Sequence, residues 1–270
     1  MSKNIKKIKN KQPARTNANK ANKKQMNKKN IRARRIIAVI IVFLFIFLAI
    51  FGIANFSNIF IVKKITVINN SKLTTEEIIQ DAGLTIGNKL FRPSRGKIKN
   101  KVEENAYIEN ARITKKLNGE ILIDVKERTP SYMLQLEDGF GYINNQGYVL
   151  EVTQTHLQLP IIKGYATQNI SAGIRLNIED LEKLDIVNQI IETATSNEIN
   201  NMITTIDITN KNNFVLEIPS ENKTVEFGDG TNINIKILWI IDLINREKGI
   251  PGSIIVNVPN IRKVYFREKV

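Results

Sequence analysis

Residues 36–54 form an apolar run of 19 amino acids without a formal charge. A helix of that length spans roughly 28 Å at about 1.5 Å of rise per residue, close to the ~30 Å hydrocarbon core of a bilayer. The preceding 35 residues contain ten lysines, four arginines and no acidic residue. This combination predicts one membrane-spanning helix, with a basic tail on one side and the bulk of the chain on the other.

Three arginines, Arg32, Arg34 and Arg35, stand directly before the apolar run. Positive charge marks the cytoplasmic flank of a span, so we expect a cytoplasmic amino terminus and an extracytoplasmic remainder from about residue 55. The alternative is a cleaved signal peptide. Because the apolar run exceeds the ~7–15 residues of a signal sequence, we favour an uncleaved anchor.

The tail, residues 1–35, has too few apolar side chains to bury a core and is predicted to be disordered. Its charge favours contact with anionic lipid, and a nucleic-acid arm is the alternative on the same electrostatics. The rest of the chain holds 26 basic and 26 acidic residues, so the sequence pI of 9.8 describes the tail alone. We expect no specific nucleic-acid binding from the neutral remainder.

The chain contains no cysteine, which excludes disulfides and thiolate metal sites. The part beyond the span must therefore depend on hydrophobic cores, and its length of about 210 residues predicts two domains. Mixed helix and strand patterns predict an α+β fold.

The segment after the span is predicted to form a β-α-α-β-β module. Thr74 and Glu77 have the spacing of a capping box, which starts a helix. Asn118-Gly119 favours a hairpin turn between two strands, and Thr129-Pro130 ends the module. The expected elements are a strand at 59–68, helices at 75–82 and after Ser94, and strands at 111–117 and 120–127.

A mixed β-rich domain with two helices is predicted for the remainder. Asn177 is placed to open the first helix, and the second carries a stripe at helical spacing formed by Ile233, Ile237, Ile240 (or Ile241) and Ile244. Core packing is the predicted role of Trp239 in that helix, with a partner-facing tryptophan as the alternative. The expected strands are at 131–137, 140–143, 148–152, 203–209, 214–218, 223–227, 253–258 and 261–267, and the second helix at 232–246.

No set of residues predicts catalysis, a cofactor or a metal. His156 is the sole histidine and lies in a predicted loop, where a solvated side chain is expected. Ser94-Arg-Gly-Lys97 and Ser220-Glu-Asn-Lys223 match the Ser-x-x-Lys spacing of penicillin-binding enzymes, but their companion motifs are absent. We interpret the chain as non-enzymatic; a membrane-anchored cell-wall enzyme with an unrecognised site is the alternative.

The last predicted strand is the best candidate for an interaction site. A terminal strand tends to lie at a sheet edge, where it can pair with an incoming segment or be blunted by its own charges. The two readings stay open. The candidate partner-binding residues are Ile254, Val256, Val258, Ile261, Arg262, Lys263, Val264, Tyr265, Phe266 and Arg267.

The order of these parts resembles the FtsQ/DivIB family of bacterial cell-division proteins. The resemblance covers nearly the whole chain, and a departure is Asn144-Asn-Gln-Gly147, where the family often has Asp-x-x-Gly. The segments that carry it are Lys63-Lys-Ile-Thr-Val-Ile-Asn-Asn70, Ile86-Gly-Asn-Lys-Leu-Phe91, Ala106-Tyr-Ile-Glu-Asn-Ala-Arg-Ile113 and Leu122-Ile-Asp-Val-Lys-Glu-Arg-Thr-Pro130. The last is similar to the family's junction between its POTRA module and its β domain.

The resemblance implies a POTRA domain at 59–129, a β domain at 130–270 and a place at the division septum. It also implies single-span partners of the FtsL and FtsB/DivIC types and a role in controlling the septal peptidoglycan synthase. In the family the partner surface includes the last β-strands. We therefore expect a partner strand to pair with Val264–Arg267, with Tyr265 or Phe266 in a shared apolar pocket, and a proline at Tyr265 to weaken binding.

Overall fold

The computed structural model describes residues 34–53, 60–259 and 263–269, and the chain divides into two units at Phe60/Ile61. Arg34–Ile53 is a helix of 20 residues that is long and apolar enough to cross a membrane by length and composition. It matches the predicted span within two residues at its start and one at its end. The predicted disorder of the tail, with Arg32, lies outside the described residues.

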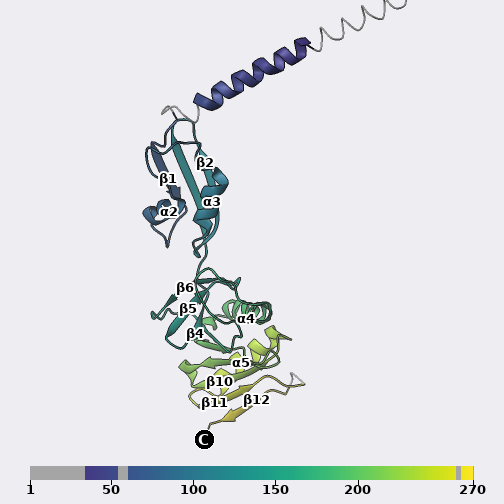
Figure 1. The fold of residues 1–270 in the computed structure, drawn as a ribbon. Helices are drawn as coiled ribbons and strands as arrows, with labels where there is room; N and C mark the ends of the chain where they lie inside the picture. The colour runs from purple at the N-terminus through teal and green to yellow at the C-terminus, as the bar shows by residue number, and fades with distance from the viewer. Residues whose placement is uncertain (1–33, 54–59, 260–262, 270) are drawn as a thin grey trace, which may run out of the picture. The chain divides into compact units, whose positions relative to one another are not determined.

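The second unit begins with a three-stranded sheet flanked by two helices (Figure 1). The strand order is β1-β3-β2, with β1 parallel and β2 antiparallel to the central strand. Alternate residues of β3, including Ile121 and Ile123, are fully buried, as are Ile78 of α2 and Ile98 of α3. The elements are β1 (Lys64–Ile68), α2 (Thr75–Ala82), α3 (Arg95–Glu103), β2 (Ile108–Lys115) and β3 (Glu120–Glu127).

Both helices start where their caps predict. The Thr74 hydroxyl accepts a hydrogen bond from Glu77 N (3.2 Å), and the Glu77 carboxylate accepts one from Thr74 N (2.7 Å). The hydrogen bonds that the Thr74 N–H and hydroxyl donate to the Glu77 carboxylate hold the pKa of Glu77 below its ordinary value. Ser94 Oγ accepts from Lys97 N at 3.3 Å, so the first Ser-x-x-Lys match is a helix cap.

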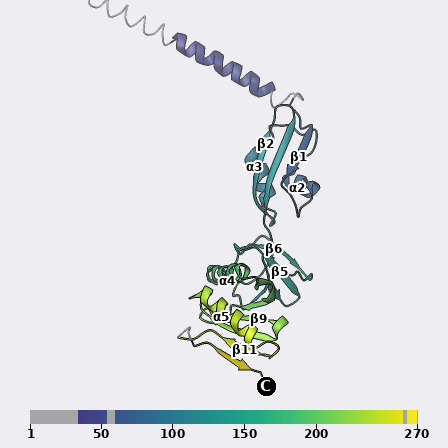
Figure 2. The same ribbon diagram turned by 180° about the vertical axis from the view of Figure 1, so that it is seen from behind.

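A nine-stranded sheet with two helices follows, here called the nine-stranded domain (Figure 2). The strand order is β12-β11-β10-β9-β8-β7-β4-β5-β6. Its helices are α4 (Ile178–Ser196) and α5 (Ile233–Arg246). Its strands are β4 (Tyr132–Leu136), β5 (Gly139–Ile143), β6 (Val149–Thr153), β7 (Ile161–Lys163), β8 (Thr205–Asp207), β9 (Phe214–Ile218), β10 (Lys223–Gly228), β11 (Gly252–Ile255) and β12 (Tyr265–Glu268).

Strand β7 is the element that the sequence pattern did not predict. It has three residues and pairs in parallel with β4 and β8, which makes it a link between the two halves of the sheet. Only Ile162 in its centre is fully buried, so the strand is too short to show the period-2 alternation of a half-buried strand.

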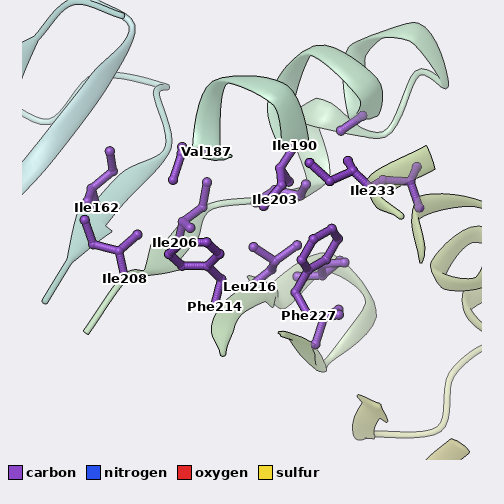
Figure 3. Close-up of a cluster of buried hydrophobic side chains, with 14 of the residues drawn as sticks. Ile162, Val187, Ile190, Ile203, Ile206, Ile208, Phe214, Leu216, Phe227 and Ile233 are labelled. Carbon is purple, nitrogen blue, oxygen red and sulfur yellow. The ribbon is translucent and has the colours of Figure 1, made fainter. Parts of the chain in front are cut away.

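The core of this domain lies between one face of the sheet and the two helices. Val187 and Ile190 of α4 point toward Ile206, Phe214 and other side chains of the strands (Figure 3). In α5 the predicted stripe is buried, with Ile240 rather than Ile241 completing it, and Trp239 is half-buried against the same cluster. Core packing of Trp239 is thus confirmed.

Candidate partner-binding site

Strand β12 lies at one edge of the nine-stranded sheet as far as the chain is described (Figure 1). It pairs with β11 in antiparallel register, with Tyr265 opposite Ile255 and Arg267 opposite Ser253. Because an edge strand has a partner on one side alone, half of its main-chain donors and acceptors face outward.

The register indicates which groups face outward. Lys269 N donates to Pro251 O at 2.9 Å, whereas Gly252 N donates away from β12, to Asn222 O at 3.2 Å. Antiparallel pairs alternate between bonded and non-bonded, so the bonded pairs along this ladder include Tyr265 and Arg267. The N–H groups directed toward the free edge are therefore those of Val264, Phe266 and Glu268.

The side chains of the candidate residues divide into two sets. Tyr265 is 55% exposed, and Lys263 and Arg267 are exposed as well. Ile254 and Val256 lie within the core, Val264 and Phe266 pack against it, and Val258 is half-buried. Ile261 and Arg262 lie outside the described residues. Lys263, Tyr265, Arg267 and the outward main chain are thus accessible to a partner. Ile254 and Val256 are fully buried and are therefore core residues rather than contact residues.

Tyr265 and Arg267 extend onto the sheet face opposite the helices. Across the strands, Tyr265 is paired with Ile255, which is paired with Glu226 of β10. Arg267 is paired in the same way with Ser253, next to Thr224. These side chains are exposed or half-buried, so a segment that adds to β12 would also meet an open, mixed polar and apolar surface.

Two residues outside the candidate partner-binding set, Gly252 and Lys223, contact β12. A Cβ on Gly252 would lie 2.5 Å from both Arg267 O and Phe266 Cζ, so only glycine permits this close approach. Lys223 Nζ lies 5.7 Å from the centre of the Phe266 ring and donates to main-chain carbonyls. In the sequence, Lys223 alternates with Val225 and Phe227, and this spacing could have predicted that the lysine side chain points into the core.

Comparison with known proteins shows what the chain is similar to. The POTRA domain of FtsQ type matches residues 60–128. DivIB of Clostridium tetani is 24% identical over 196 residues, covering 72% of this chain and 73% of the relative. DivIB of Clostridium acetobutylicum is 28% identical over 192 residues (70% and 75%), and that of Listeria monocytogenes 31% over 139 residues (49% and 50%). The chain is thus similar to FtsQ/DivIB proteins, and its residues 60–128 match the family's POTRA domain.

The names of these relatives support a role in cell division, and the POTRA match covers the three-stranded sheet that precedes the nine-stranded domain. The structure also shows the surroundings of the residues that were considered for catalysis. His156 is exposed and packs edge-on against Phe140, with 5.2 Å between ring centres. Lys223, from the second Ser-x-x-Lys match, is buried and bonded to carbonyl oxygens of Glu247 and Ile250.

Proposed function

We propose that this chain is an FtsQ/DivIB protein and a non-enzymatic scaffold of the division machinery that binds its partners through the free edge of β12. The partners would be single-span proteins of the FtsL and FtsB/DivIC types, linked through them to the septal peptidoglycan synthase. The observation that carries the proposal is the edge position of β12, with exposed Tyr265 and Arg267, in a chain with an FtsQ-type POTRA domain.

The proposed organisation has four parts, and the basic flank sets their orientation. Arg34 and Arg35 begin the N-terminal helix, and all of the chain's net charge of +14 lies at or before them. A cytoplasmic tail and an extracytoplasmic remainder follow from that asymmetry. The parts are the tail (1–35), the span (36–54), the POTRA domain (59–129) and the β domain (130–270), at the membrane of the division septum.

The proposed mechanism is strand addition at β12. A partner's extended segment would bond to the outward N–H groups of Val264, Phe266 and Glu268, and the main-chain ladder would supply affinity. Specificity would come from Tyr265 and Arg267, because aromatic and arginine side chains anchor interfaces most often.

Because of this register, a proline substitution tests strand addition better at Glu268 than at Tyr265. A proline at Tyr265 would remove an N–H that bonds to β11, and so would damage the strand itself. Glu268 is exposed and its N–H faces outward, so Glu268→Pro removes a donor to the partner and no core side chain.

Glu268→Pro is expected to weaken binding of the FtsB/DivIC-type partner about tenfold, the effect of losing one or two ladder bonds. Glu268→Ala is the matched control, since it removes the same side chain and keeps the N–H; it should bind within about twofold of the original chain. The measurement is the dissociation constant of the full-length proteins in nanodiscs. Equal weakening by both variants would assign the loss to the carboxylate and reject strand addition.

The divisome assignment has a separate test. A fluorescent fusion at the amino terminus should form a band at mid-cell when the source cells begin to constrict. A uniform signal around the membrane throughout the cell cycle would reject the assignment, whatever the outcome at Glu268.

A further inference from the structure

One end of the POTRA domain gathers three segments that are distant in sequence, 61–64, 84–92 and 116–119, here called the hairpin end. Val62 N donates to Asn88 O and Lys63 N to Gly119 O, each at 2.8 Å. The junction with the nine-stranded domain is at the other end, where Arg128 N donates to Tyr107 O. The chain thus enters the POTRA domain at the hairpin end (Figure 2).

The hairpin end exposes large apolar side chains. Leu117 is 77% exposed, Ile86 is 68% exposed and Phe91 is 41% exposed. Leu117 directly precedes the Asn118-Gly119 turn, a place where polar residues are usual. Three such side chains from two of the segments, gathered at one end, indicate a surface that is covered by something less polar than water.

The same end is strongly basic. Its three segments contain Lys63, Lys64, Lys89, Arg92 and Lys116 and no acidic residue. Glu120, directly after the third segment, accepts a hydrogen bond from Lys116 Nζ at 2.9 Å. The opposite end of the domain is different, because segments 104–109 and 124–128 carry four acidic and two basic residues. The basic charge is therefore concentrated where the apolar side chains are.

Chain length limits how far the hairpin end can lie from the end of the N-terminal helix. Eight Cα–Cα steps separate Ile53 from Ile61, and a fully extended chain covers roughly 28 Å in that number of steps. If the helix spans the bilayer, as the proposed function has it, the hairpin end is held within reach of the lipid headgroups.

We propose that the hairpin end docks on the surface of an anionic bilayer, with Leu117 and Ile86 in the interface and the lysines on lipid phosphates. Exposed leucine and isoleucine beside basic side chains is the composition of interfacial membrane-binding surfaces. Lysine stems can lie along the apolar boundary while their ammonium groups reach the phosphates. This inference rests on the membrane anchoring in the proposed function.

The absence of cysteine allows a clean test. Leu117→Cys and Ile178→Cys each give the full-length protein one thiol for an environment-sensitive fluorophore, and the two native side chains are equally exposed, at 77%. Ile178, on α4 of the nine-stranded domain, is the matched control for the fluorophore's own affinity for lipid. The proteins are reconstituted into phosphatidylcholine vesicles with or without phosphatidylglycerol, and lipids carrying a quencher are included.

The expected result is a blue shift at position 117 in anionic vesicles, with at least about twofold stronger quenching than at position 178. Lys63→Gln with Lys116→Gln should reduce docking, about fivefold in the docking equilibrium for each lost charge, and high salt should do the same. Lys211→Gln with Lys248→Gln removes the same charge from exposed sites elsewhere and should have no effect.

Equal quenching at positions 117 and 178 in anionic vesicles would overturn the proposal. So would a blue shift at position 117 that appears only when an acidic partner protein is added, since it would assign the hairpin end to a protein. Flotation with the vesicles is measured in the same samples. A protein that fails to float refutes the membrane anchor in the proposed function, whereas one that floats with position 117 in water refutes docking alone.

Discussion

Replacing Asp180 by alanine is expected to lower the free energy of unfolding of the nine-stranded domain by about 3 kcal/mol. Asp180 is fully buried in the first turn of α4, and its carboxylate accepts hydrogen bonds from Ala166 N (2.9 Å) and Thr167 N (2.7 Å). Both main-chain donors would lose their partner in Asp180→Ala. Ala166 is exposed and Thr167 half-buried, so the expected loss comes from two hydrogen bonds to a buried charged acceptor, worth about 1.5–3 kcal/mol each.

The same carboxylate joins α4 to the loop before it. The Thr167 hydroxyl donates to Asp180 and accepts from Asn177 N, while Asn177 caps the helix by accepting from Asp180 N at 2.8 Å. Lys183 Nζ lies 4.0 Å from the Asp180 carboxylate and 2.8 Å from that of Glu179. In Asp180→Ala it would lose the first of these two ion pairs. Loss of Asp180 therefore weakens the helix start as well as the loop.

Denaturant unfolding of the full-length protein, followed by a signal from Trp239, measures this effect. Asp185→Ala is the control, because Asp185 is exposed on the same helix and its loss should change the free energy of unfolding by less than about 0.5 kcal/mol. Asp180→Asn, which keeps one acceptor oxygen, should fall between the two. A similar small change in Asp180→Ala and Asp185→Ala would show that the loop does not depend on this carboxylate.

The helices and strands that were predicted best are those whose signals come from neighbouring residues in the sequence. The capping box of Thr74 and Glu77 and the cap at Asn177 placed the starts of α2 and α4, since a cap involves residues three positions apart. Strand β9 was placed at Phe214–Ile218 from its alternation alone. A helix start or a half-buried strand can be read from a few neighbouring residues.

Features that depend on distant segments could not be read in this way. The partners of Asp180 lie 13 and 14 residues away, and Asp180 in the sequence looks like an ordinary acidic residue in a first turn. Strand β7 is defined by its neighbours β4 and β8 rather than by its own three residues. The exposure of Leu117 likewise follows from the packing of the hairpin against 61–64.

The candidate partner-binding site also combines features that the local sequence predicts with features that depend on distant segments. Alternation in the sequence places neighbouring residues on opposite faces of the last strand, and in β12 Tyr265 is exposed whereas Phe266 packs against the core. Which main-chain N–H groups point to the free edge depends on the register with β11, and the register is fixed by pairing across the sheet. For this reason we chose Tyr265 for a proline substitution from the sequence, whereas the hydrogen-bond register of β12 with β11 favours Glu268.

Replacing Lys223 by methionine is expected to lower the free energy of unfolding by about 2–3 kcal/mol and to loosen β12. Lys223 is 3% exposed at the start of β10. Its ammonium group donates to Glu247 O (2.9 Å), Ile250 O (3.1 Å) and Glu221 O (3.3 Å). Glu247 is the C-cap of α5, where the carbonyl end of the helix dipole favours a cation.

Methionine has nearly the length and shape of the lysine stem, so Lys223→Met removes the donors while leaving little cavity. The carbonyls of Glu247 and Ile250 then lose a donor, and the turn leading into β11 loses its anchor. Since Gly252 of β11 is in close contact with Phe266, movement of that turn should reach β12. Hydrogen exchange at Phe266–Glu268 is expected to rise in Lys223→Met and to stay unchanged in Lys248→Met, an exposed lysine in the same turn. Lost stability without faster exchange at β12 would confine Lys223 to capping α5 and would exclude a role in holding the partner-binding strand.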